Sequence, residues 1–222
     1  MRLKNIFNIM IIFSGLITGQ QKMEAGILLG WYQPELTGLD TSLESSAGGS
    51  EIIRKNLLLG YSFSIPLFPS ARVGYVQGGS YFSGASDTTQ FSRKLIYRMF
   101  VLETYFRPLR RLELNFALAP MWNSAVIKLD TKNTKSVWDA QIGNYRIDVQ
   151  APEKMSNNYF GFASLIGIRY YIFSWFAVDI KTGFMSTNYK AANWKLDGKI
   201  ISGPVLKIDE ESIFLMQLIF SW

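Results

Sequence analysis

The last ten residues read Ile213-Phe214-Leu215-Met216-Gln217-Leu218-Ile219-Phe220-Ser221-Trp222, and they decide the fold. Successive side chains of a β-strand point to opposite sides. One face of this strand therefore carries Phe214, Met216, Leu218, Phe220 and Trp222. A strand this long and apolar at the edge of a soluble sheet would invite aggregation, whereas a strand that closes a barrel leaves no free edge. The stretch predicts the closing strand of a β-barrel.

This ending resembles that of bacterial outer-membrane β-barrel proteins, in which an aromatic residue at the end of the final strand is read by the barrel-assembly machinery. The resemblance identifies Phe220 and Trp222 as the assembly signal. It implies the Gram-negative outer membrane as the compartment, and it implies outer-membrane lipid, including lipopolysaccharide, and the assembly machinery as partners. It does not imply a particular function.

The first 19 residues have the order of a secretory signal peptide. Arg2 and Lys4 precede an apolar core from Ile6 to Ile17, and Thr18-Gly19 ends the segment. A core of about 12 residues is too short to cross a bilayer as a helix. We expect residues 1–19 to be cleaved and residues 20–222 to form one barrel domain. Removal of Arg2 and Lys4 lowers the formal net charge from +6 to +4.

Composition excludes several classes of function. The chain has no cysteine and no histidine. It therefore lacks a thiol nucleophile, the commonest general base and the usual zinc ligand. We expect no catalytic, metal or cofactor site and no enzyme activity. The basic residues are scattered along the chain, which does not support nucleic-acid binding, since that needs a concentrated basic face.

Alternation of apolar and small or polar residues predicts the transmembrane strands. Hydrophobic residues make up 48% of the chain, yet outside the leader no apolar run approaches the ~20 residues of a spanning helix. In the first strand, Ile27, Leu29 and Trp31 share one face, while Glu24 and Leu28 lie on the other. The predicted strands cover residues 23–32, 54–65, 71–82, 95–106, 112–119, 158–171, 176–184 and 213–222.

The connections alternate in length. Long polar loops are predicted at 34–51, 84–92, 128–157 and 187–209, and tight turns at 66–70, 107–111 and 173–175. Outer-membrane barrels have short periplasmic turns and longer external loops. The pattern thus predicts an all-β, eight-stranded antiparallel up-and-down transmembrane β-barrel with both termini in the periplasm. This architecture is similar to the transmembrane domain of OmpA and to the OmpX and OmpW families.

Six charged residues are predicted to point into the lumen. They are Arg72, Glu103, Glu113, Arg169, Asp179 and Lys181. Both faces of the strand that carries Glu103 are largely apolar, so the pattern alone does not decide which of its faces is inward; we place Glu103 inward. The lumen of an eight-stranded barrel is just filled by side chains, and charges enclosed there must be paired. Three acids and three bases cancel. We therefore expect a neutral, paired lumen network and neither a reactive nor a conducting site.

Aromatic residues fall near the ends of the predicted strands. We interpret Trp31, Trp122, Trp175 and Trp222 as interfacial aromatics of the membrane girdle. Trp138 and Trp194 fall in external loops, where they either contact an extracellular partner or pack within the loops. Arg107, Arg110 and Arg111 form a basic turn, which is either simply solvated or a contact for anionic headgroups.

Two functions remain open. The first is a structural or surface-interaction role through the long external loops around a side-chain-filled lumen. The second is a conduit for small hydrophobic molecules, resembling the OmpW family. A conduit needs an open apolar interior near the external end, where Leu28, Val76, Val101 and Leu165 are predicted to point inward. A lipid-modifying barrel enzyme needs a nucleophile and a base, and the absence of histidine argues against its hydrolase version.

Overall fold

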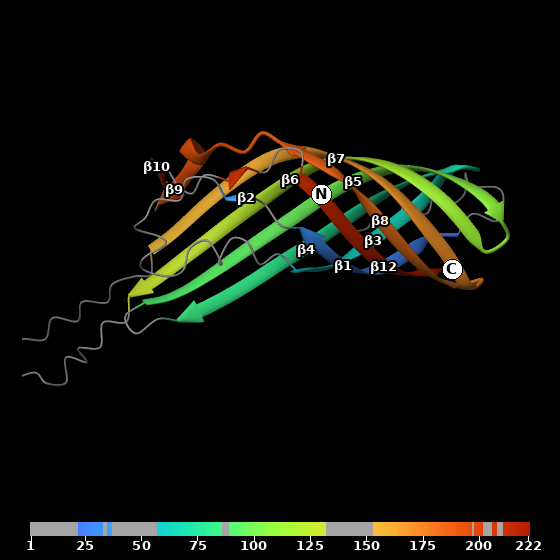
Figure 1. The fold of residues 1–222 in the computed structure, drawn as a ribbon, viewed down its shortest axis with the longest axis horizontal. Helices are drawn as coiled ribbons and strands as arrows, with labels where there is room; N and C mark the ends of the chain where they lie inside the picture. The colour runs from blue at the N-terminus through green and yellow to red at the C-terminus, as the bar shows by residue number, and fades with distance from the viewer. Residues whose placement is uncertain are drawn as a thin grey trace, which may run out of the picture.

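Eight antiparallel strands form a closed ring in the computed structural model (Figure 1). It describes residues 22–32, 35–36, 57–85, 89–131, 153–196, 198–201, 206–207 and 211–222. The ring consists of β1 (Glu24–Tyr32), β3 (Leu57–Phe68), β4 (Ala71–Ala85), β5 (Thr89–Leu109), β6 (Leu112–Thr131), β7 (Glu153–Phe173), β8 (Phe176–Thr187) and β12 (Glu211–Ser221). Each strand pairs with the ring strand that follows it in the chain, as predicted. The predicted leader at 1–19 lies outside the described residues.

The C-terminal strand closes the ring. β12 pairs with β8 on one side and with β1 on the other, from Glu24 opposite Ser221 to Tyr32 opposite Ile213. The backbone N–H of Trp222 donates to the carbonyl of Met23 at 3.1 Å. Both edges of the apolar last strand are therefore paired, which removes the aggregation hazard of a free edge.

Three two-residue turns lie at one end of the barrel, which we call the turn end; the opposite end is the loop end. The turns are Pro69–Ser70, Arg110–Arg111 and Ser174–Trp175. All three are shorter than the sequence predicted, because β3 continues to Phe68, β5 to Leu109 and β7 to Phe173. Two of these strands change register close to a proline, at Pro66 in β3 and between Phe106 and Leu109 in β5. A proline is tolerated in a strand at such an irregularity.

Three of the central strands are longer than predicted. β5, β6 and β7 contain 21, 20 and 21 residues, whereas about 9–11 residues suffice for a tilted transmembrane strand. Outward apolar residues of β6 run from Leu112 to Trp122, which matches that length. We call the band of outward apolar side chains around the ring the apolar belt. The rest of β6 continues past this belt to Thr131. Figure 1 shows β5, β6 and β7 extending well beyond the other end of the ring.

Short elements follow β8 at the loop end, in the segment predicted as a loop. They are the 3₁₀ turn η2 (Ala191–Asn193), β9 (Trp194–Leu196), β10 (Lys199–Ile201) and β11 (Leu206–Lys207). β9 extends the sheet by pairing with Met155 and Ser156 of β7. β11 pairs with β2 (Glu35–Leu36) in a separate two-stranded sheet. No helix among the described residues is long and apolar enough to cross a membrane.

Side chains alternate between the lumen and the exterior as the sequence predicted. Leu28, Ala117 and Leu215 are buried, while their neighbours Ile27, Phe116 and Phe214 are exposed on the outside. The strand whose phase was ambiguous also follows the prediction, since Glu103 is buried and Phe100 and Leu102 are exposed. An apolar exterior around a closed ring suits contact with lipid, because the strands of a closed ring pair their backbone polar groups with one another and leave no free edge.

One glycine in β8 allows close approach of a neighbouring strand, and it gives a testable prediction. A Cβ at Gly183 would overlap the carbonyl oxygen of Ser164 and lie 2.9 Å from the Cα of Leu165. We expect Gly183→Ala to lower the free energy of unfolding by ~1–3 kcal/mol through overpacking. The matched control is Gly79→Ala, whose Cβ would meet the carbonyl oxygen of Leu95 at an ordinary 3.6 Å. Urea titrations in detergent micelles with equal midpoints for both variants would contradict this prediction.

Candidate functional site

The lumen near the turn end contains a cluster of seven buried charges, which we call the inner charge network. Its members are Glu24, Arg72, Glu103, Glu113, Arg169, Asp179 and Lys181, each at most 7% exposed. They come from β1, β4, β5, β6, β7 and β8. The structure thus brings together all six charged residues that the sequence placed in the lumen, and it adds Glu24.

Arg169 is the centre of this network. Its guanidinium binds both oxygens of Glu24, at 2.9 and 2.7 Å from Nη1, and Oδ2 of Asp179, at 3.0 Å from Nε and 2.6 Å from Nη2. It also lies 3.7 Å from Glu103 and 3.8 Å from Glu113. Fork-shaped contacts of this kind are the strongest hydrogen bonds to carboxylates in proteins.

The other cations complete the pairing. Arg72 forms ion pairs with Glu103 and Glu113, and Lys181 with Glu103 and, at 3.1 Å, with Asp179. The strand register explains the arrangement, because Arg72 lies directly opposite Glu103, and Arg169 lies opposite Glu113 on one side and Asp179 on the other. Unlike charges that face each other across strands attract.

Charge neutrality requires two residues that sequence reasoning missed. The predicted balance of three acids and three bases is wrong, because Glu24 makes four acids. Arg107 restores neutrality from the mouth of the lumen: it is half-exposed, and its guanidinium donates to Glu113 and to the hydroxyl of Tyr171, both at 3.0 Å. The sequence did contain a signal for each of them. Glu24 is four residues before the inward Leu28, and Arg107 is four residues after the inward Glu103, and an even spacing along a strand places two side chains on the same face.

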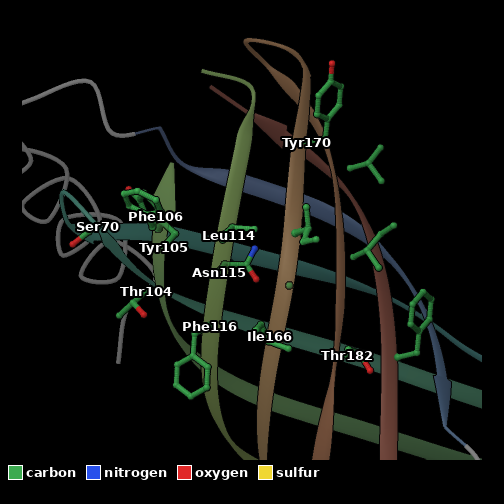
Figure 2. Close-up of a pocket in the computed structure, with 15 residues that line it drawn as sticks. Ser70, Thr104, Tyr105, Phe106, Leu114, Asn115, Phe116, Ile166, Tyr170 and Thr182 are labelled. Carbon is green, nitrogen blue, oxygen red and sulfur yellow. The ribbon is translucent and has the colours of Figure 1, made fainter. Parts of the chain in front are cut away.

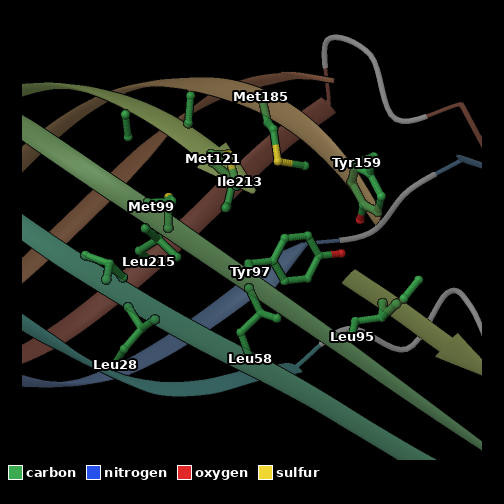
Figure 3. Close-up of a cluster of buried hydrophobic side chains, with 14 of the residues drawn as sticks. Leu28, Leu58, Leu95, Tyr97, Met99, Met121, Tyr159, Met185, Ile213 and Leu215 are labelled. Carbon is green, nitrogen blue, oxygen red and sulfur yellow. The ribbon is translucent and has the colours of Figure 1, made fainter. Parts of the chain in front are cut away.

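The remaining lumen, toward the loop end, is filled mainly by apolar side chains that we call the apolar plug (Figure 3). Buried polar residues complete the filling, among them Arg93, whose guanidinium donates to the hydroxyl of Ser80 at 2.6 Å. Figure 3 shows Leu28, Leu58, Tyr97, Met99, Met121, Met185, Ile213 and Leu215 converging in the interior. Between plug and network lies a cavity of about 20 Å³, room for roughly one water molecule. Val76, Val101 and Leu165, predicted to point inward, are also buried here.

Trp194 caps the plug at the loop end. The sequence left open whether this residue contacts a partner or packs within the loops, and the structure shows packing, with only 1% of the residue exposed. Its indole N–H donates to the hydroxyl of Tyr189 at 2.7 Å, and the Tyr189 ring packs edge-on against Tyr159. Burial raises the pKa of Tyr189, which follows β8, to about 12. Trp138 lies outside the described residues.

The four tryptophans predicted to be interfacial all have outward-facing positions. Trp175 and Trp222 are exposed at the turn end, and Trp31 is exposed on β1. Trp122 is partly covered, because it packs against Phe100 with ring centroids 4.9 Å apart and against Tyr75 at 6.0 Å. Their role as a membrane girdle stays a prediction. Phe220 and Trp222, the predicted assembly signal, also face outward at the turn end.

A larger hollow of about 800 Å³ lies on the outside of the barrel (Figure 2). It is lined mainly by outward-facing apolar side chains, among them Phe106, Leu114, Phe116, Ile166 and Tyr170. Since these residues face outward, the hollow lies on the outer surface of the barrel and is not part of the lumen. Among the described residues, no group of three or more acidic side chains has the geometry to hold a metal ion.

These features define a class of protein. A closed ring of eight antiparallel strands, apolar outside and filled with side chains inside, with short turns at one end, is the architecture of small bacterial outer-membrane β-barrel proteins. The chain has this fold.

Comparison with known proteins agrees on the fold. No family model matches the chain, and no curated protein matches it in sequence. Among solved structures, a major outer membrane protein from Thermus thermophilus aligns with a TM-score of 0.53 at 10% identity, covering 92% of this chain and all of that one.

Two further solved structures align at lower scores. Ail, the attachment invasion locus protein of Yersinia pestis in complex with the heparin analogue sucrose octasulfate, has a TM-score of 0.46 at 10% identity, with 90% and 96% of the two chains covered. The outer membrane protease OmpT of Escherichia coli has a TM-score of 0.41 at 8% identity, with 92% and 99% covered. At these identities the likeness concerns the fold and not the activity.

Proposed function

We propose that the protein resides in the bacterial outer membrane as a plugged barrel with a structural or surface-interaction role. The filled lumen carries this proposal: the inner charge network fills the turn end and the apolar plug fills the loop end. The apolar outer face supports the membrane location, because an exposed belt of this size on a soluble protein would drive aggregation. A protein at this location contacts outer-membrane lipid, including lipopolysaccharide, and is inserted by the barrel-assembly machinery; we propose both as partners.

The interaction surface in this proposal is the loop end. With both chain ends of the barrel at the turn end, the loop end faces the outside of the cell. The stretches 37–56 and 132–152, which join ring strands at that end, lie outside the described residues. The first is rich in serine and glycine, and the second contains Trp138 and Tyr145. Loops on a rigid scaffold commonly carry binding functions. We assign an extracellular partner to these loops.

The lumen gives the functional test. We expect the purified mature protein to show no steady single-channel conductance in planar bilayers, because buried, paired charges and a packed apolar plug leave no water-filled path. Heat-dependent migration on gels serves as the control that the inserted protein is folded. Reproducible currents of porin size from the folded protein would overturn the plugged-barrel proposal.

One observation favours the conduit as a second candidate. The apolar plug contains four methionines, Met99, Met121, Met155 and Met185, and these flexible side chains repack easily around an apolar guest. A conduit should therefore bind a fluorescent long-chain alkyl probe in the lumen, and Trp194→Ala should strengthen binding by uncapping the plug. If neither wild type nor Trp194→Ala binds the probe above the level of empty micelles, the conduit is ruled out.

The proposal includes no catalytic role. The sequence has no histidine and no cysteine, and each of the four carboxylates of the inner charge network forms an ion pair with an arginine or lysine.

A further inference from the structure

A second cavity opens where the lumen meets the turn end, and five basic residues line it. We call this cavity the basic vestibule. Its volume is about 770 Å³, and its lining includes Lys22, Arg72, Arg107, Arg110 and Arg111 against a single acid, Glu24. Binding sites for small molecules commonly have volumes of about 300–1,000 Å³. The vestibule is therefore large enough for a ligand, and its lining is strongly basic.

The acids of the inner charge network do not neutralise all of these cations. Arg72 pairs with Glu103 and Glu113, and Arg107 with Glu113. With Arg107 included, the network has four acids and four bases. Lys22, Arg110 and Arg111 take part in no ion pair among the described residues, and the Lys22 ammonium donates only to the carbonyl of Ser174 at 3.0 Å. The vestibule consequently has an excess of three positive charges.

The wall of the vestibule is preorganised. The Tyr105 ring lies between two guanidinium groups, 4.6 Å from that of Arg72 and 5.2 Å from that of Arg107. The Tyr105 hydroxyl donates to the carbonyl of Pro69 at 2.9 Å. Arg107 is fixed in turn by Glu113 and Tyr171. A ligand bound here finds Arg72 and Arg107 already ordered and needs to order only the exposed side chains of Lys22, Arg110 and Arg111, which lowers the entropic cost of binding.

We propose that the basic vestibule binds a phosphate-bearing anion. Adjacent arginines offer forked N–H donors that match phosphate oxygens, and a phosphate group carries one or two negative charges and several acceptors to meet them. Such a group occurs in soluble phosphorylated compounds and in the headgroups of anionic phospholipids. The anion site does not depend on whether the lumen is plugged. It rests on the proposed function in one respect only, namely that the turn end faces the periplasm.

Calorimetric titration with inorganic pyrophosphate tests the site, using the mature protein in phosphatidylcholine nanodiscs at low salt. We expect saturable binding by the wild type and at least tenfold weaker binding by the double variant Arg110→Ala/Arg111→Ala. The matched control is Lys195→Ala/Lys199→Ala, which removes the same charge from exposed positions at the loop end and should change affinity less than twofold. Absence of wild-type binding, or equal weakening in both double variants, would overturn the site.

A second arm distinguishes the two sources of phosphate. The titration is repeated in nanodiscs that contain phosphatidylglycerol, and in nanodiscs given the same surface charge by oleate, which has no phosphate. If a lipid headgroup is the natural ligand, phosphatidylglycerol suppresses pyrophosphate binding more strongly than oleate does. If the ligand is soluble, both lipids act equally. Both results support a phosphate site, and neither depends on whether the lumen conducts.

Discussion

Arg169→Ala is expected to lower the free energy of unfolding by about 3–5 kcal/mol, because it leaves buried carboxylates without their shared partner. Glu24 depends on Arg169 most, since both of its oxygens contact the guanidinium. Asp179 retains only Lys181, at 3.1 Å, as a close cation. Water compensates only in part: Glu24 borders the open basic vestibule, whereas Asp179 and Glu113 are fully buried and the cavity beside Arg169 holds roughly one water molecule.

Equilibrium unfolding in urea, followed by tryptophan fluorescence in detergent micelles, measures the effect of Arg169→Ala. Arg169→Lys keeps the charge but loses the fork and should be intermediate. Asp179→Asn in the Arg169→Ala background should recover part of the loss, because it removes one uncompensated acid. Lys195→Ala, at an exposed position, is the control. If Arg169→Ala unfolds at the same urea concentration as Lys195→Ala, the inner charge network does not hold the barrel together.

The second large effect is expected on the outer surface. Phe116 faces outward, is 46% exposed and lies five positions after the turn residue Arg111. With ~3.3 Å per residue and a ~45° tilt, it sits roughly 12 Å from the turn end, near the middle of an apolar band about 25 Å tall. Phe116→Arg should therefore cost ~2–4 kcal/mol of folding free energy in a bilayer.

Phe173→Arg is the matched control, because Phe173 is also an outward phenylalanine, 56% exposed, but lies at the turn end. Arginine near the interface costs only about 0–1 kcal/mol. Folding of both variants into phosphatidylcholine vesicles, titrated with guanidinium chloride, should show this difference. Equal costs at the two depths would mean that the belt around Phe116 is not buried in lipid.

The sequence predicts those features of the structure that depend on the local environment of a strand. Lipid on one side and a crowded lumen on the other impose alternation, so the faces of Phe116 and Ala117 were readable from the pattern. The inward positions of Arg169 and Asp179 followed from the same alternation, but the alternation did not predict which charges pair with each other. Past Trp122, outward residues of strand β6 such as Ser124 and Lys128 are polar and show no apolar contrast with the lumen side. The ends of the long strands were therefore not predictable.

Other features depend on contacts between distant parts of the chain. Trp194 is buried because β9 pairs with β7, about 40 residues earlier in the chain, and no local pattern encodes this pairing. Arg107 reaches Glu113 because β5 continues past Pro108 with a change of register, where the proline had indicated a turn. Glu24 lay on the predicted inward face, but as the lone charge of its strand it was not recognised as part of a network.

The length of β6 determines how far its last residue, Thr131, lies above the membrane edge that Trp122 is predicted to mark. Thr131 lies nine positions beyond Trp122, which at the same rise and tilt corresponds to a height of roughly 20 Å above the hydrocarbon edge. The headgroup layer on one side of a bilayer is only about 5–8 Å thick. A macromolecule that docks on the ends of β6 and β7 would therefore approach without steric hindrance from the headgroups, so even a bulky, rigid partner would have access.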